Sequence, residues 1–186
     1  MTETKLMRRV GGGHNMRLDG VSDILIRCRG ASVMDIGCNR GMVAYEFANN
    51  GAAVVHGCDN YEAGIATARE VFTDLRAVRS QFEVVDLTAP PAEALAPFMG
   101  ENYDIMVVLA TFHKLARIMT LEQFDALVSH LGALTKTYFV WRATSFDVPA
   151  NEAEMQRVGK CLSGFRLVQW SVMSEQLGIA AVWKRG

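Results

Sequence analysis

Residues 31–41 read ASVMDIGCNRG, and this stretch decides the predicted fold. The apolar run from Ala31 to Ile36 predicts a short buried strand. Gly37 allows the chain to turn sharply where that strand ends, and Gly41 allows the following segment to pack closely against the sheet. A segment of helical period follows from about Met42 to Asn50. The stretch therefore predicts a strand, a glycine-bearing turn and a helix in direct succession.

Short apolar runs alternate with longer segments of helical period over most of the chain. This alternation is typical of consecutive βαβ units, whose strands form a mainly parallel sheet with helices on both faces. The predicted strands of these units span residues 31–36, 53–58, 82–85, 103–109 and 137–141. The predicted helices span residues 17–28, 42–50 and 61–75, a short segment opened by Pro90 and Pro91, a segment capped by Thr120 and Gln123 that runs to 134, and residues 151–161.

The end of the chain departs from the alternation. Phe165–Val172 and Ile179–Trp183 read as two strands separated by a short polar loop with no room for a helix. Such strands are expected to pair as an antiparallel hairpin. The predicted fold is therefore α/β: a doubly wound, mainly parallel seven-stranded sheet with an antiparallel C-terminal hairpin. Residues 17–186 are expected to form this domain. Residues 1–16, which include three consecutive glycines, are expected to be flexible and to act as a lid or a tail.

Size and composition exclude several classes of protein. A chain of 186 residues fits one domain, and half of its residues are hydrophobic, which allows a sizeable core. No apolar run approaches the roughly 18 residues of a membrane span, and the first residues lack a secretory pattern. The cysteines form no C-x-x-C pair, so we expect them to be reduced, in a cytoplasmic protein without a metal site. The formal net charge of −1 argues against a polyanion as the main partner.

The ligand of an open parallel sheet binds outside the carboxyl ends of its strands. Asp35 places a carboxylate in the first turn, where it would repel pyrophosphate but would suit a ligand with a cationic amino group. Asp59 follows the second strand at about 20 residues from that turn, a position from which an acid binds ribose hydroxyls. The alternatives are a structural turn at Asp35 and a helix N-cap at Asp59.

The later strands end in further polar residues. Asp86 follows the third strand and is placed to accept a hydrogen bond from an adenine amino group, with Leu87 beside it; the alternative is a loop acid that satisfies local N–H groups. Leu109 ends the fourth strand, and His113 follows in a loop expected beside the reacting group. His113 is the candidate general base, because its ordinary pKa lies near neutrality. The alternative is a half-exposed loop histidine without a role.

Together these residues resemble the class I S-adenosylmethionine-dependent methyltransferases. Residues 35–41, DIGCNRG, are similar to the family's E/D-x-G-x-G-x-G motif, with Asn39 in place of the middle glycine and Arg40 where small residues are usual. Residues 103–109, YDIMVVL, are similar to its fourth-strand motif, and the closing hairpin matches its last strands. The resemblance covers residues 18–184. It implies S-adenosyl-L-methionine as cofactor, held by Asp35, Gly37, Asn39, Gly41, Asp59, Asn60, Asp86, Leu87 and Leu109.

The resemblance also implies the reaction, displacement of the sulfonium methyl by a nucleophilic atom of an acceptor. The loop after the fourth strand carries no signature of a known subfamily, so the subfamilies do not assign the acceptor. We expect an O or N atom of a small molecule. The alternatives are an RNA methyltransferase, which the basic residues of the N-terminal part would favour, and a non-catalytic S-adenosylmethionine-binding domain. A nicotinamide-dependent enzyme is disfavoured by the glycine spacing and the hairpin.

Overall fold

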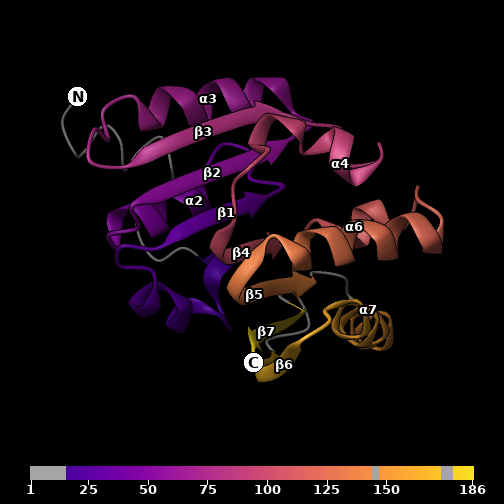
Figure 1. The fold of residues 1–186 in the computed structure, drawn as a ribbon. Helices are drawn as coiled ribbons and strands as arrows, with labels where there is room; N and C mark the ends of the chain where they lie inside the picture. The colour runs from indigo at the N-terminus through magenta and orange to yellow at the C-terminus, as the bar shows by residue number, and fades with distance from the viewer. Residues whose placement is uncertain (1–15, 144–146, 173–177) are drawn as a thin grey trace.

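A computed structural model describes residues 16–143, 147–172 and 178–186 of the chain. The segment expected as a lid therefore lies almost wholly outside the described residues. Seven strands form one sheet in the order β3-β2-β1-β4-β5-β7-β6 (Figure 1). The strands are β1 (Ser32–Ile36), β2 (Val54–Asp59), β3 (Arg79–Val84), β4 (Tyr103–Leu109), β5 (Thr135–Ala143), β6 (Phe165–Val172) and β7 (Ile179–Arg185).

The strand pairing has the predicted pattern. Strands β1 to β5 pair in parallel, with β1 between β2 and β4. The chain moves outward from β1 to β3 and then crosses back to β4, so the strand order reverses between β1 and β4. Strand β7 pairs with β5 and with β6 in antiparallel fashion, which confirms the hairpin. The reversal places the expected ligand cleft above the carboxyl ends of β1 and β4.

Helices cover both faces of the sheet (Figure 1). The helices and turns are η1 (Met16–Leu18), η2 (Ser22–Arg27), α2 (Met42–Asn49), α3 (Glu62–Phe72), α4 (Pro91–Ala94), η3 (Ala96–Phe98), α5 (Phe112–Leu115), α6 (Leu121–Ala133) and α7 (Val148–Cys161). Buried residues of η1, η2, α2 and α3 share one hydrophobic core with one face of the sheet. Buried residues of α4, η3, α5, α6 and α7 share a second core with the other face.

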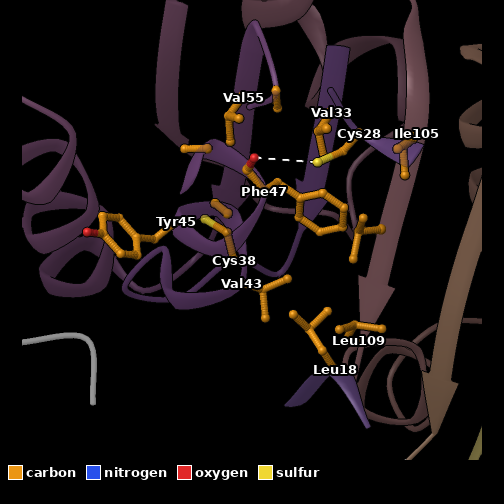
Figure 2. Packing of buried hydrophobic residues seen from close by; sticks show 14 of the residues in the cluster. Leu18, Cys28, Val33, Cys38, Val43, Tyr45, Phe47, Val55, Ile105 and Leu109 are labelled. Carbon is orange, nitrogen blue, oxygen red and sulfur yellow. Dashed lines mark hydrogen bonds between the residues drawn. The ribbon is translucent and has the colours of Figure 1, made fainter. Parts of the chain in front are cut away.

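Alternate residues of the central strands supply the two cores. Ile105 and Val107 of β4 belong to the first core, whereas Met106 and Val108 belong to the second. This period of two is what a strand buried on both faces requires. In the first core, Phe47 of α2 lies close to the central strands, and its carbonyl accepts a hydrogen bond from the Cys28 thiol at 3.6 Å (Figure 2).

Two local expectations need correction. The predicted helix over 17–28 is replaced by two short 3₁₀ segments, because Gly20 between them has φ of +78° and interrupts the helical path. The loop after β4 contains the short helix α5, which the sequence analysis did not predict. The capping box is confirmed, since the Thr120 hydroxyl accepts from the Gln123 N–H at 3.3 Å and the Thr120 N–H donates to the Gln123 side chain at 2.8 Å.

Three strands are longer than predicted, and one of them, β7, continues beyond Trp183 to Arg185. Strand β3 begins at Arg79 rather than at 82. The polar residues of its first half give no strand signal in the sequence, but an edge strand tolerates them. Strand β5 extends in both directions, since it pairs with β4 on one side and β7 on the other. Across the described residues, we find no helix with the length and hydrophobicity that a membrane crossing demands.

Candidate functional site

A cavity of about 420 Å³ opens at the carboxyl ends of the parallel strands. Its walls come from the ends of β1 to β5, from the start of α2 and from the segment around α5. The sequence-predicted cofactor residues that line it are Asp35, Gly37, Asn39, Asp59, Asn60, Asp86, Leu87 and Leu109. Residues widely separated along the chain therefore meet at one edge of the sheet.

Gly41 is the predicted residue that does not line the cavity. It has φ of +73° and immediately precedes α2. A Cβ atom there would lie 3.0 Å from the Cβ of Ala68 on α3, so the absence of a side chain lets the turn approach that helix. This role is the close packing expected of Gly41, although between the turn and α3 rather than against the sheet.

Gly37 shapes the turn that separates β1 from α2. Its φ is +76°, and a Cβ atom there would overlap the side chain of Thr111 at the start of α5. Asn39, two residues on, also has a positive φ, of 51°, a conformation that asparagine tolerates better than most residues. The backbone of the turn thus borders the cavity, and there is no space for a side chain at Gly37.

Asp59 links the turn to the end of β2. One carboxylate oxygen accepts the backbone N–H of Asn39 at 2.9 Å, and the other accepts the N–H of Tyr61 at 2.9 Å. Asp59 is not the N-cap of α3, because Tyr61 holds that position without a side-chain capping hydrogen bond; Asp59 accepts the N–H of Tyr61 and also borders the cavity. Carboxylate oxygens have further lone pairs, so Asp59 can accept hydrogen bonds from a ligand while holding the turn.

Asp35 is the most deeply buried acid of the site, with 3% of its surface exposed. Burial raises the pKa of its carboxyl to about 7; the nearby Asp59 acts in the same direction, and the backbone N–H of Ala44 and the charge of Arg17 oppose the rise. Within the described part of the chain, its Oδ2 has no hydrogen-bond partner. A buried carboxylate oxygen at a cavity wall is suited to a cationic donor.

Asp86 and Leu87 form the wall at the end of β3. Leu87 is buried, whereas Asp86 is exposed and accepts the backbone N–H of Thr88 at 2.9 Å and its hydroxyl at 2.7 Å. These hydrogen bonds hold the pKa of Asp86 below its usual value, so it is ionised at neutral pH. One carboxylate oxygen of Asp86 therefore satisfies local donors, as the alternative of a loop acid predicts. The residue also borders the cavity.

Two wall residues after β4 were missed by sequence reasoning. Ala110 has φ of +56°, an uncommon conformation for a residue with a side chain, and uncommon backbone of this kind is concentrated at functional sites. Thr111 donates its hydroxyl hydrogen toward the carbonyls of Ile36 and Leu109, both at 3.2 Å, and so ties the ends of β1 and β4 together. Nothing in the sequence signals the conformation of Ala110, since alanine has no preference for a positive φ.

His113 is placed away from this cavity. It lines a second hollow between α5, α6 and α7, together with Phe124 and Glu154. Burial lowers the pKa of His113, and the charges of Lys114 and Arg117 lower it further, so the ring is neutral at pH 7. The structure therefore gives the predicted role of His113 as a base at the reacting group no support.

This chain is similar in sequence to known proteins. A model of the methyltransferase domain family matches residues 33–137. The chain is 26% identical over 127 residues to the O-antigen chain terminator bifunctional methyltransferase/kinase WbdD of Escherichia coli, a match covering 66% of this chain and 17% of that protein. It is 30% identical over 92 residues to the ubiquinone biosynthesis O-methyltransferase of Neisseria meningitidis, covering 50% of this chain and 35% of that enzyme. The matched region thus spans a minor part of each of these relatives.

Solved structures share the fold. The magnesium protoporphyrin IX methyltransferase of Synechocystis PCC 6803, crystallised with S-adenosylmethionine, superposes with a TM-score of 0.67 at 20% identity over 100% of this chain and 92% of that one. A TehB-like S-adenosylmethionine-dependent methyltransferase of Corynebacterium glutamicum gives 0.65 at 16% identity, over 98% and 94% of the two chains.

Proposed function

This chain belongs to the methyltransferase domain family, whose class I members depend on S-adenosylmethionine, and from that premise we propose that it methylates an O or N atom of a small-molecule acceptor. The relatives support a small molecule, since their names refer to ubiquinone biosynthesis and to magnesium protoporphyrin IX. The four cysteines are free thiols, which supports the cytoplasm as the proposed compartment.

One observation carries the proposal for the cofactor site: the buried, unpartnered Oδ2 of Asp35, among the described residues, borders the same cavity as the glycine turn. S-adenosylmethionine carries an ammonium group, and Asp35 would hold it. Asp59 and Asn60 would bind the ribose hydroxyls, and Asp86 with Leu87 would bind the adenine. Gly37, Asn39 and Gly41 would give the turn its shape, and Leu109 would border the reacting end.

The cofactor, when bound, supplies a methyl group that is already activated on a positively charged sulfur. The protein therefore has mainly to bind, align and exclude water. The walls at Leu87, Leu109 and Ala110 are suited to exclude water, because apolar groups form them. We propose that alignment follows from the fixed junction of β1 and β4, where the Thr111 hydroxyl contacts the carbonyl of Ile36.

Calorimetry with S-adenosylmethionine and S-adenosylhomocysteine tests the cofactor proposal. We expect saturable binding of both to the wild-type chain, and Asp59→Ala should weaken it by at least about tenfold, the usual effect of losing hydrogen bonds to a charged group. Absence of binding at millimolar concentration would refute the proposal. Turnover is then read as S-adenosylhomocysteine released with mixtures of small hydroxyl- and amine-bearing acceptors. Binding without release for any mixture would favour a non-catalytic domain.

A further inference from the structure

The two edges of the sheet differ in how well they are protected. Strand β3 forms one edge and β6 forms the other (Figure 1). On β3, Arg79 forms an ion pair with Glu101 at 2.6 Å, and Glu83 forms one with Arg69 of α3 at 2.6 Å. Charged side chains on an edge discourage pairing with another strand, because the new strand would remove them from water. Of the eight residues of β6, Arg166 alone is charged, so this edge lacks that protection.

Strand β6 also exposes large apolar side chains. Leu167, Val168, Trp170 and Val172 expose between 43% and 54% of their surfaces. The outer edge of a sheet presents, in addition, backbone N–H and C=O groups with which a further strand can pair. An exposed apolar strip of this kind marks a contact with another molecule. The strip and the open edge together favour a β-strand as the occupant.

Three of these side chains share one face of the sheet. Residues that pair across antiparallel strands point to the same face, and Leu167 and Trp170 pair with Trp183 and Ala181 of the second core. A register shift in β6 places both on this face although they are three residues apart. Val172 likewise pairs with a residue of that core. Within the described part of the chain, none of the three β6 residues belongs to the second core, so they extend its apolar surface to the edge.

The opposite face of β6 is fixed to the rest of the domain. Gln169 pairs with Val182, a residue of the first core, and its side-chain amide donates to the carbonyl of Gly20 at 3.0 Å. Strand β6 is therefore held in place on one face, while its apolar strip and its edge are available to a partner. A strand that is already ordered loses little conformational entropy when it binds.

Two copies of β6 are complementary to each other. In an antiparallel pair about a two-fold axis, the register that pairs all eight residues sets Leu167 of one copy against Trp170 of the other, and Phe165 against Val172. Phe165 packs against the second core, so all four residues lie on the same face of the sheet. Each cross-strand pair is thus apolar on both sides, which is the arrangement that stabilises neighbouring strands.

Charge does not oppose this arrangement. The same register sets Arg166 of one copy against Ser171 of the other, so the two arginines do not meet. The β6 residues also lie outside the described lining of the cavity that contains Asp35, so a partner on β6 leaves that cavity open. A second copy therefore matches the strip in shape, in polarity and in charge, and it supplies both halves of the contact from one sequence.

We propose that two copies of this chain form a two-fold symmetric dimer by antiparallel pairing of their β6 strands, so that one sheet continues through both copies. The contact extends over the eight residues of each strand, or about 26 Å at about 3.3 Å per residue. A single strand pair is a small interface, so the dimer dissociates in the micromolar range of concentration. This inference concerns a surface remote from the cofactor site and does not depend on the proposed function.

Sedimentation equilibrium of the full chain without ligand tests the dimer. We expect the weight-average mass to rise from 20.5 kDa at about 1 μM toward twice that value at about 200 μM. Trp170→Lys places a charge in both halves of the contact and should weaken association by about tenfold or more. Leu167→Lys should act in the same way and keeps the inference testable if Trp170→Lys does not fold, which circular dichroism establishes.

Met99→Lys is the matched control, because Met99 is 82% exposed and lies outside β6. It should associate as the wild type does. Hydrogen exchange should show the amides of β6 becoming more protected as the concentration rises. A wild-type mass that stays at 20.5 kDa up to about 200 μM would overturn the inference. So would association that folded Trp170→Lys and Leu167→Lys leave unchanged, that Met99→Lys weakens equally, or that protects amides elsewhere but not in β6.

Discussion

Thr111 occupies the space that a side chain on Gly37 would need. A Cβ atom on Gly37 would overlap the Thr111 Oγ1 and would lie 2.9 Å from its Cγ2. The two residues follow β1 and β4, the strands between which the order of the sheet reverses. Their contact therefore fixes the distance between the loop after β1 and the loop after β4, which both border the cavity. This contact can be tested by mutation.

Gly37→Ala should destabilise the protein by about 2–5 kcal/mol, since it adds the clash with Thr111 to the cost of a left-handed backbone at φ of +76°. Gly30→Ala is the control. Gly30 has nearly the same φ, +73°, but nothing lies within 4 Å of a Cβ atom there, so only the backbone cost of about 1–2 kcal/mol is expected. Urea unfolding measures both. Equal losses in the two variants would show that the contact with Thr111 does not matter.

Asp59→Ala should lower both stability and cofactor affinity. The carboxylate accepts the N–H groups of Asn39 and Tyr61, so its removal frees the glycine turn from the end of β2. We expect a loss of about 1–2 kcal/mol in the free energy of unfolding. Asp74→Ala removes an exposed acid outside the cavity and should change neither quantity. If Asp59→Ala unfolds earlier but binds S-adenosylhomocysteine normally, the acid has only a structural role.

Asp35→Asn should show opposite effects on stability and binding. The pKa of Asp35 is raised to about 7 by burial, above the value it has in the unfolded chain. The unfolded state therefore releases this proton at lower pH, and the carboxyl reduces stability progressively as the pH rises from about 4 to 7. Asn cannot ionise, so the variant should melt above the wild type at pH 8 and approach it near pH 4.

The same ionisation should control binding of the cofactor ammonium. Wild-type affinity for S-adenosylhomocysteine should rise as the pH increases through about 7, because the carboxylate form of Asp35 is the one that attracts a cation. Asp35→Asn should bind more weakly at pH 8 and should lack this rise between pH 6 and 8. A variant that binds as tightly as the wild type at pH 8 would remove Asp35 from the cofactor site.

The sequence predicts the central elements well because their signals are local. Strand β4 is bounded as expected from its apolar run, and the two final strands are recognised because no helix fits between them. Asp35 and Asp59 are found because they lie at the carboxyl ends of buried parallel strands, and these ends necessarily meet at one edge of the sheet. The topology of the sheet thus brings together residues that lie far apart in the sequence.

Other features depend on tertiary contacts that a single sequence does not encode locally. The helix α5 contains only Phe112–Leu115, and its packing against α6 through Phe112 and Phe124 determines which way the following residues face. Arg142 has no recognisable motif, and its place in the cavity follows from the pairing of β5 with β4. The same holds for His113, since proximity to β4 in sequence does not specify the face of α5, and the structure places His113 in the second hollow.

His113→Ala tests the base that the sequence suggests. Nδ1 of His113 is buried with no partner among the described residues, and the ring lines the hollow that also contains Glu154, whose pKa is raised to about 7 by burial. A general base must reach the acceptor, and this hollow is separate from the cavity of Asp35. We therefore expect His113→Ala to keep wild-type S-adenosylhomocysteine affinity and to retain turnover within about threefold at pH 7. A loss of turnover beyond about a hundredfold with intact binding would instead make His113 the base, and it would require α5 to turn toward the acceptor during the reaction.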